Sequence, residues 1–223
     1  MPTLTDVLRE RTTLAPEQAE WLHLLVGDWQ LLSDLSFADL VLWVPSDPDG
    51  WLAVAHVRPT TGRMVFFDDL VGRRIGPGRR PLLDQAFVGA RIVRAPEPEF
   101  RDDMPIREEA IPVVRDGRPL AVLTRHTNLA TLRTPSRLEL TYVATADALA
   151  RMIAAGDFPT AGAPTGQRRG APRVGDGVIR LSADGTVTYA SPNAVSAIHR
   201  LGHVGDVVGG SLAQIVTDVL RAS

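Results

Sequence analysis

The sequence of 223 residues contains no cysteine. Disulfide frameworks, thiolate metal sites, iron–sulfur clusters and cysteine nucleophiles are therefore excluded. Lysine is missing as well, so all basic residues are arginines. This removes the lysine on which Schiff-base enzymes, P-loop proteins and protein kinases depend.

Long apolar runs and an excess of one charge are also missing. No stretch approaches the roughly 18 apolar residues that a membrane span needs. The N-terminus has an early acid, Asp6, and no apolar core of a signal peptide. The net charge of -2 gives no reason to expect nucleic-acid binding. We therefore expect a cytoplasmic protein that binds neither DNA nor membranes.

The composition is that of a folded protein, with 44% hydrophobic and 22% charged residues. The length allows two units. Residues 156–173 are rich in glycine and proline and show no apolar periodicity, which is typical of a linker. We predict a first domain over 1–155, a flexible linker over 156–173 and a second module over 174–223.

The first module alternates helical and strand patterns. In chain order it predicts helices at 4–11 and from Pro16 to about 33, strands at 38–44, 51–57 and 64–67, a short helix at 79–88, a hairpin of 105–113 with 118–126, and a helix at 135–155. Asp116-Gly117 between two apolar runs is a strong hairpin signal. This order predicts an α+β domain with an antiparallel sheet flanked by helices. We expect the outer helices, about 15–33 and 135–155, to lie side by side and to offer a dimer surface.

The second module begins near Val174. Strands are expected at 177–181 and 187–190, around the turn signal Asp184-Gly185. Ser191-Pro192 is a capping residue followed by a favoured first helical residue, and a last helix is expected after Ser211.

This second stretch resembles the start of a PAS domain. The resemblance rests on Asp176–Leu181, Asp184–Val187, Tyr189–Ala194, Leu201-Gly202 and Val208-Gly209. Ser191 replaces the asparagine usual in the family. Only about fifty residues follow Val174, so the resemblance implies the first half of a PAS-like α+β domain, incomplete and poorly protected.

The first module resembles a GAF domain, through its terminal helices, loose middle segment and the late hairpin Ile111–Leu123. The whole chain is similar to the sensory region of an actinobacterial two-component sensor histidine kinase of the PdtaS type. The resemblance implies that a catalytic part using ATP and magnesium lies beyond Ser223, that a response regulator is its partner, and that it forms a homodimer. The sequence itself is then expected to carry no catalytic residue, no metal and no cofactor.

The resemblance also implies a ligand site between the sheet and the loose segment from Arg58 to Met104. The candidate ligand-binding residues are His56, Phe66, Phe67, Arg73 and Arg74. Arginine with nearby aromatic rings suits a planar anion, such as a nucleotide. The alternatives are that these arginines only keep a loop in solution, that the phenylalanines belong to the core, and that the pocket is empty or occluded.

Other chemical interpretations are weaker. His199 and His203 have the spacing of a metal pair, but Gly202 is expected to end the helix between them. His126, a possible phosphoacceptor, lies at the end of a predicted strand. The leading hypothesis is therefore a signal-sensing region that transfers no phosphate itself. A GAF–PAS regulatory module of a phosphatase, cyclase or RNA-binding regulator, and a free-standing small-molecule binding protein, remain open.

Overall fold

The structure is a computed structural model that describes residues 4–46, 50–130, 134–160 and 172–222. The chain divides into two compact units, Met1–Ala171 and Pro172–Ser223. Each unit is described by itself below.

The first unit contains the helices α1 (Leu4–Arg11), α2 (Pro16–Ser36) and α4 (Arg137–Ala155). Local signals bound α4 at both ends. At the start of α4, the Ser136 hydroxyl accepts a hydrogen bond from the Glu139 amide, and the Glu139 carboxylate accepts one from the Ser136 amide. Gly156, in the left-handed region at φ 83°, ends this helix. None of the helices in the described ranges is both long and apolar enough to cross a membrane.

The sheet of this unit is entirely antiparallel. Its strands are β1 (Ala38–Ser46), β2 (Gly50–Val57), β3 (Arg74–Ile75), β4 (Val93–Arg94), β5 (Glu99–Arg101), β6 (Met104–Arg115) and β7 (Arg118–Asn128). The order is β3-β2-β1-β7-β6-β4, and β5 also pairs with β6. The β6–β7 turn places Asp116 and Gly117 at φ 51° and 74°, which is why an Asp-Gly pair suits it.

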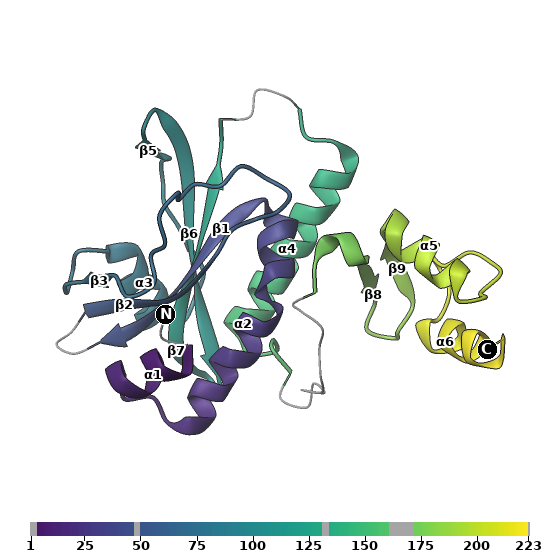
Figure 1. The fold of residues 1–223 in the computed structure, drawn as a ribbon, viewed down its shortest axis with the longest axis horizontal. Helices are drawn as coiled ribbons and strands as arrows, with labels where there is room; N and C mark the ends of the chain where they lie inside the picture. Colours follow the sequence, from purple (N-terminus) through teal and green to yellow (C-terminus); the bar gives the residue numbers. More distant parts are fainter. Residues whose placement is uncertain (1–3, 47–49, 131–133, 161–171, 223) are drawn as a thin grey trace. The chain divides into compact units, whose positions relative to one another are not determined.

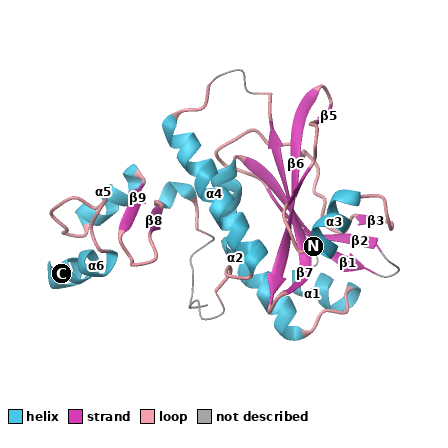
Figure 2. Ribbon diagram, turned by 180° about the vertical axis from the view of Figure 1, so that it is seen from behind, coloured by secondary structure: helices cyan, strands magenta, loops and turns pink. Residues whose placement is uncertain are grey.

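Helices lie on both faces of the sheet (Figure 1). On one face α2 and α4 contact each other, and α4 crosses β6; Figure 2 shows the same pair from behind. On the other face, α3 (Pro81–Gly89) packs on β6 and β7. An apolar cluster fills the α3 side, and it includes Val41, Trp43, Trp51, Phe66, Leu83 and Val122.

Most predicted elements of this unit are confirmed, including both hairpins and the side-by-side outer helices. The predicted strand at 64–67 is wrong. The Val65 amide donates to the Asp39 carboxylate, and the Phe66 carbonyl accepts from Arg58, so backbone groups of this segment bond to side chains instead of a strand. On the edge of β2 away from β1, the pairing strand is β3, further along the chain.

The second unit is small. It contains a short 3-10 turn (Val174–Asp176), β8 (Ile179–Leu181), β9 (Val187–Ala190), α5 (Pro192–Arg200) and α6 (Leu212–Ala222). β8 and β9 pair with each other as a two-stranded sheet. The Ser191 hydroxyl accepts from the Ala194 amide at the start of α5, as the sequence predicts. Its core consists of Val187, Ile198, Val207 and Ile215.

Candidate functional site

A row of ionisable side chains crosses the sheet on the face that α3 covers. Asp39 of β1 is the register partner of His126 of β7, and His126 is the partner of Glu108 of β6. Because register partners point to the same face, the three side chains lie next to one another. All three residues are buried.

His56 of β2 lies diagonally beside this row. Its Nε2 is 3.9 Å from Oδ1 of Asp39, and its Nδ1 is 3.6 Å from Oδ1 of Asp69. The His56 side chain is only 1% exposed, yet neither ring nitrogen has a hydrogen-bond partner among the described residues. Oδ1 of Asp39 is likewise buried without one. Buried polar groups without partners are uncommon in folded proteins, so this corner of the sheet invites a functional explanation.

Burial controls the protonation of these groups. It raises the pKa of Asp39 from 3.8 to about 6, against the lowering effects of the Val65 amide and Arg58. It lowers the pKa of His56, assisted by the charge of Arg58, and lowers the pKa of His126 well below its usual value. Burial also raises the pKa of Glu108, although the Arg80 guanidinium binds this carboxylate. Both histidines are therefore neutral at pH 7.

The Phe66 ring sits between the two histidines. Its centroid is 5.7 Å from the ring of His56 and 4.8 Å from the ring of His126, edge to face in both cases. The Arg101 guanidinium lies over the Phe66 ring at 4.7 Å. A planar ring contacted by two imidazoles and one guanidinium thus already occupies this face of the sheet.

Hydrogen bonds on both sides hold Phe66 in place. Val65, the preceding residue, donates its amide to Asp39. The Arg58 guanidinium donates to the carbonyl oxygens of Phe66, at 2.8 Å, and of Phe67, at 3.2 Å. The segment that covers the sheet is therefore tied to the same carboxyl group whose pKa is raised.

His126 has a second set of contacts in the sheet. Its Nε2 lies 2.9 Å from the Thr124 hydroxyl, which also accepts from Nε1 of Trp43 at 2.9 Å. His126 lies within β7 and its whole side chain is enclosed, so a phosphoryl donor has no approach to it. This environment favours a structural or sensing role over phosphotransfer.

The structure brings together two of the five candidate ligand residues. His56 and Phe66 are in contact. Phe67, the next residue, is 78% exposed. Arg73 and Arg74 are exposed at β3, which pairs with the opposite end of β2 from His56. Ligand binding by any of the five stays a prediction.

Sequence reasoning missed Asp39 and Arg101. It noticed the adjacent acids Glu108 and Glu109 but gave them no role, because neighbours in a strand point to opposite faces. The signal for Asp39 was present, since an acid inside the apolar run Ala38–Val44 is unusual in a buried strand. Arg101 carried no comparable signal, and the acid pair did not indicate which residues would surround Glu108. Their relation to the site depends on strand register and on the position of β5, which are long-range properties.

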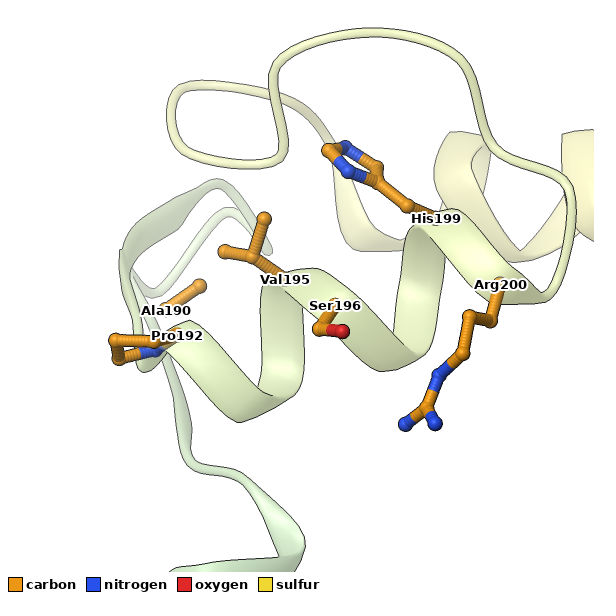
Figure 3. A pocket seen from close by; sticks show the side chains of 6 residues that line it. All are labelled: Ala190, Pro192, Val195, Ser196, His199 and Arg200. Atoms are coloured by element: carbon orange, nitrogen blue, oxygen red, sulfur yellow. The ribbon is translucent and has the colours of Figure 1, made fainter.

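The second unit has a shallow hollow along α5, lined by Ala190, Pro192, Val195, Ser196, His199 and Arg200 (Figure 3). His199 Nε2 lies 3.1 Å from the Gly205 carbonyl oxygen, so its ring participates in local structure. Across the described ranges, no group of three or more histidine and acidic side chains is arranged to hold a metal ion. The hollow is an open surface and offers less chemistry than the face around Phe66.

Comparison with known proteins adds a family to this geometry. Residues 4–146 match the family model for the GAF domain of the histidine kinase PdtaS. The chain is 41% identical over 223 residues to the sensor histidine kinase PdtaS of Mycolicibacterium smegmatis (strain ATCC 700084 / mc(2)155), covering 99% of this chain and 44% of that protein. It is 42% identical over 216 residues to that of Mycobacterium tuberculosis (strain ATCC 25618 / H37Rv), covering 95% of this chain and 43% of that protein.

A solved structure described as the sensor region of a sensor histidine kinase is also similar. It aligns with a TM-score of 0.76 at 40% identity, covering 96% of this chain and 74% of that one. The chain spans less than half the length of the curated relatives it matches.

Proposed function

Because this chain belongs to the family of the PdtaS histidine kinase GAF domain, we propose that it is the sensory region of a cytoplasmic two-component sensor histidine kinase. In this proposal it detects a signal and controls autophosphorylation by a catalytic part that uses ATP and magnesium. That part corresponds to the portion of the relatives that this chain does not cover, and it passes the phosphoryl group to a response regulator.

The observation that carries a sensory role is the set of unpaired buried groups around Phe66. A purely structural sheet face has no need of a neutral histidine whose ring nitrogens have only long contacts, to Asp39 and Asp69, beside a buried carboxyl group. Perturbed pKa values and unsatisfied polar atoms in one place are typical of functional sites. A ligand or a change in protonation would act on Asp39 and His56, and both contact the covering segment or its ring.

The route from this face to the rest of a kinase would be the pair of outer helices. β7 carries His126 on one face and Arg125 on the other, and Arg125 bonds to Asp147 of α4. A shift of β7 would therefore be transmitted to α4, the last helix of the first unit. In support of the second module as the start of a PAS-like domain, the β8–β9 hairpin and the serine cap of α5 occur where the resemblance requires them.

The test is a chimera. Residues 1–223 replace the aligned region of the M. smegmatis relative, and the autophosphorylation rate is measured with labelled ATP. Phe66→Leu, which alters the ring between the two histidines, is compared with Phe67→Leu, which changes an exposed neighbour. We expect a several-fold change of rate for Phe66→Leu and none for Phe67→Leu. An inactive chimera, or equal rates in both variants and the parent, would contradict the proposal.

A further inference from the structure

A second row of charged side chains crosses the opposite face of the sheet, beneath α4. Arg94 of β4 is the register partner of Glu109 of β6, and Glu109 is the partner of Arg125 of β7. Glu109 binds both neighbours, with Oε1 2.5 Å from Nε of Arg94 and Oε2 2.5 Å from Nη2 of Arg125. The row therefore alternates positive, negative and positive charge across three strands.

Helix α4 places further charges over this row. Asp147 and Arg151 are four residues apart and thus share one face of the helix. Oδ1 of Asp147 lies 2.6 Å from Nη2 of Arg125. A pocket of about 430 Å³ lies between α4 and the sheet. The charged side chains just named line it, together with Ile92 and Ala150.

The bonds of Arg125 leave one side of its guanidinium unused. Nη2 donates a hydrogen bond to Asp147 and forms an ion pair with Glu109. Nη1 of Arg125 and Oε2 of Glu109 are both buried and have no hydrogen-bond partner among the described residues. The Arg125 side chain is 9% exposed, so water in bulk does not satisfy this nitrogen. A buried charged donor without an acceptor is energetically costly.

The charges of the pocket also favour an anionic ligand. The pocket walls carry three guanidinium groups, of Arg94, Arg125 and Arg151, and two carboxylates. Arg151 makes no ion pair within the part of the chain that the structure describes. One positive charge is therefore in excess among the side chains that line this pocket, and it lies on the exposed Arg151 beside the buried Arg125.

We propose that this pocket binds a small anion through a phosphate or carboxylate group, with Nη1 of Arg125 and the guanidinium of Arg151 as its donors. Arginine forks match the geometry of both oxyanions. The two carboxylates hold Arg125 in position and leave one unit of positive charge, so a singly charged group balances the pocket. The pocket lies on the α4 side of the sheet, and the cluster around Phe66 lies on the α3 side.

Binding here would join α4 to the sheet. The anion would bridge Arg125 of β7 and Arg151 of α4, and would add a second polar link to the ion pair between Arg125 and Asp147. The regulatory meaning of this bridge rests on the proposed sensory function, in which α4 carries the signal. The binding itself does not depend on that function.

The experiment is a titration of the chain of residues 1–223 with sodium phosphate and, separately, sodium malonate, at ionic strength held constant with chloride. Arginine Nε–H signals in 1H–15N spectra report on Arg125, and calorimetry gives the dissociation constant. Arg151→Gln is compared with Arg137→Gln, an exposed arginine in the first turn of the same helix. Arg125→Lys, which keeps the charge but loses Nη1, is the second variant, and thermal unfolding checks that it is folded.

We expect saturable shifts, with Arg151→Gln weakening binding about tenfold or more and Arg137→Gln leaving it unchanged. Saturation by phosphate alone identifies a phosphorylated ligand, and saturation by malonate alone a carboxylate ligand. A linear response to both anions, or equal affinities of the two glutamine variants, would overturn the proposal. Neither result measures kinase activity, so failure here leaves the sensory role standing.

Discussion

Asp39 is an acidic residue placed where its ionised form is unfavourable. Its side chain is fully buried in β1, next to a neutral histidine on each neighbouring strand. The charged or titratable groups that face it are His56 of β2, His126 of β7, Arg58 and, beyond His56, Asp69. Arg58 alone brings a nearby positive charge, and it does not offset the loss of hydration, because the pKa of Asp39 still rises to about 6.

The raised pKa fixes the sign of the pH dependence. The folded protein binds this proton more tightly than the unfolded chain, whose value is near 3.8. Asp39 therefore contributes stability below about pH 4, and this contribution is lost as the pH rises through about 6. The whole difference amounts to roughly 2–3 kcal/mol, by the usual conversion of a pKa shift.

We predict that Asp39→Asn raises the free energy of unfolding at pH 7.5 by about 1–2 kcal/mol. The amide removes the buried charge and keeps an oxygen that accepts from the Val65 amide. Urea unfolding at pH 7.5 and pH 4.5 measures the effect, and the gain should shrink at the lower pH. Asp116→Asn, in the exposed β6–β7 turn, is the matched control and should change little. Loss of stability at pH 7.5 in Asp39→Asn would show that the ionised carboxylate holds the segment in place.

The residues of the candidate site were only partly predictable from sequence. His56 and Phe66 follow from the position of the loose segment in a GAF-like order of elements. The contact of Phe66 with His126 could not be predicted, because it depends on the register between β1 and β7. Arg73 and Arg74 were candidates because they form a basic pair. The sequence does not show that β3 pairs with the end of β2 that is far from His56.

At the scale of elements, local signals predicted best. The caps of α4 and α5 and the Asp-Gly turn operate within three or four residues, so the sequence determines them directly. The apolar run at 64–67 has the composition of a strand, yet its backbone hydrogen bonds go to side chains of Asp39 and Arg58. Those partners come from other strands or from the end of β2, and no local pattern reveals them.

Helix α4 presents different apolar residues to its neighbours and to solvent. Ala146, Ala150 and Ile153 are buried, and Leu149 is half-buried, whereas Leu140 is 57% and Val143 is 39% exposed. A second copy of the chain would meet the exposed pair. Leu149 is a poor probe of such an interface, since a charge there would also disturb the packing within one chain.

We predict that Val143→Glu lowers the dimer fraction, because it places a charge on an apolar surface that a second copy would cover. Sedimentation velocity across a concentration series measures this fraction. Val88→Glu makes the same change at an 86% exposed position of α3, on the other face of the sheet, and should have no effect. Equal dimer fractions in the two variants would show that the dimer interface does not include this surface of α4.

Across the whole molecule, the two units differ in how completely their sheets are built. The first has a seven-stranded sheet with helices on both faces and an apolar cluster on the α3 side. The described residues of the second form one hairpin, a 3-10 turn, two helices and a small cluster of buried apolar side chains, Val187, Ile198, Val207 and Ile215. Its remaining large apolar side chains include Val204 and Leu220, which are 95% and 72% exposed.

This contrast predicts unequal protection from hydrogen exchange. A two-stranded sheet is marginal in water, because it buries little apolar surface. The outer edge of β9 is only partly covered, by hydrogen bonds of Val187 with Gly209 and Gly210 and by a bridge between Thr186 and Ser211. The central strands β1, β6 and β7 are paired on both sides, so their amides should exchange only through opening of the whole first unit. We therefore expect amides of β8 and β9 to exchange at least about a hundredfold faster than those of β6 and β7 at pH 7.

Mass spectrometry on peptic fragments gives both exchange rates in one experiment. The edge strand β3, which belongs to the first unit, serves as an internal reference for fast exchange at a sheet edge. Similar slow rates in both units would mean that further contacts complete the β8–β9 sheet, and dilution would then separate contacts between chains, which weaken, from contacts within one chain, which do not.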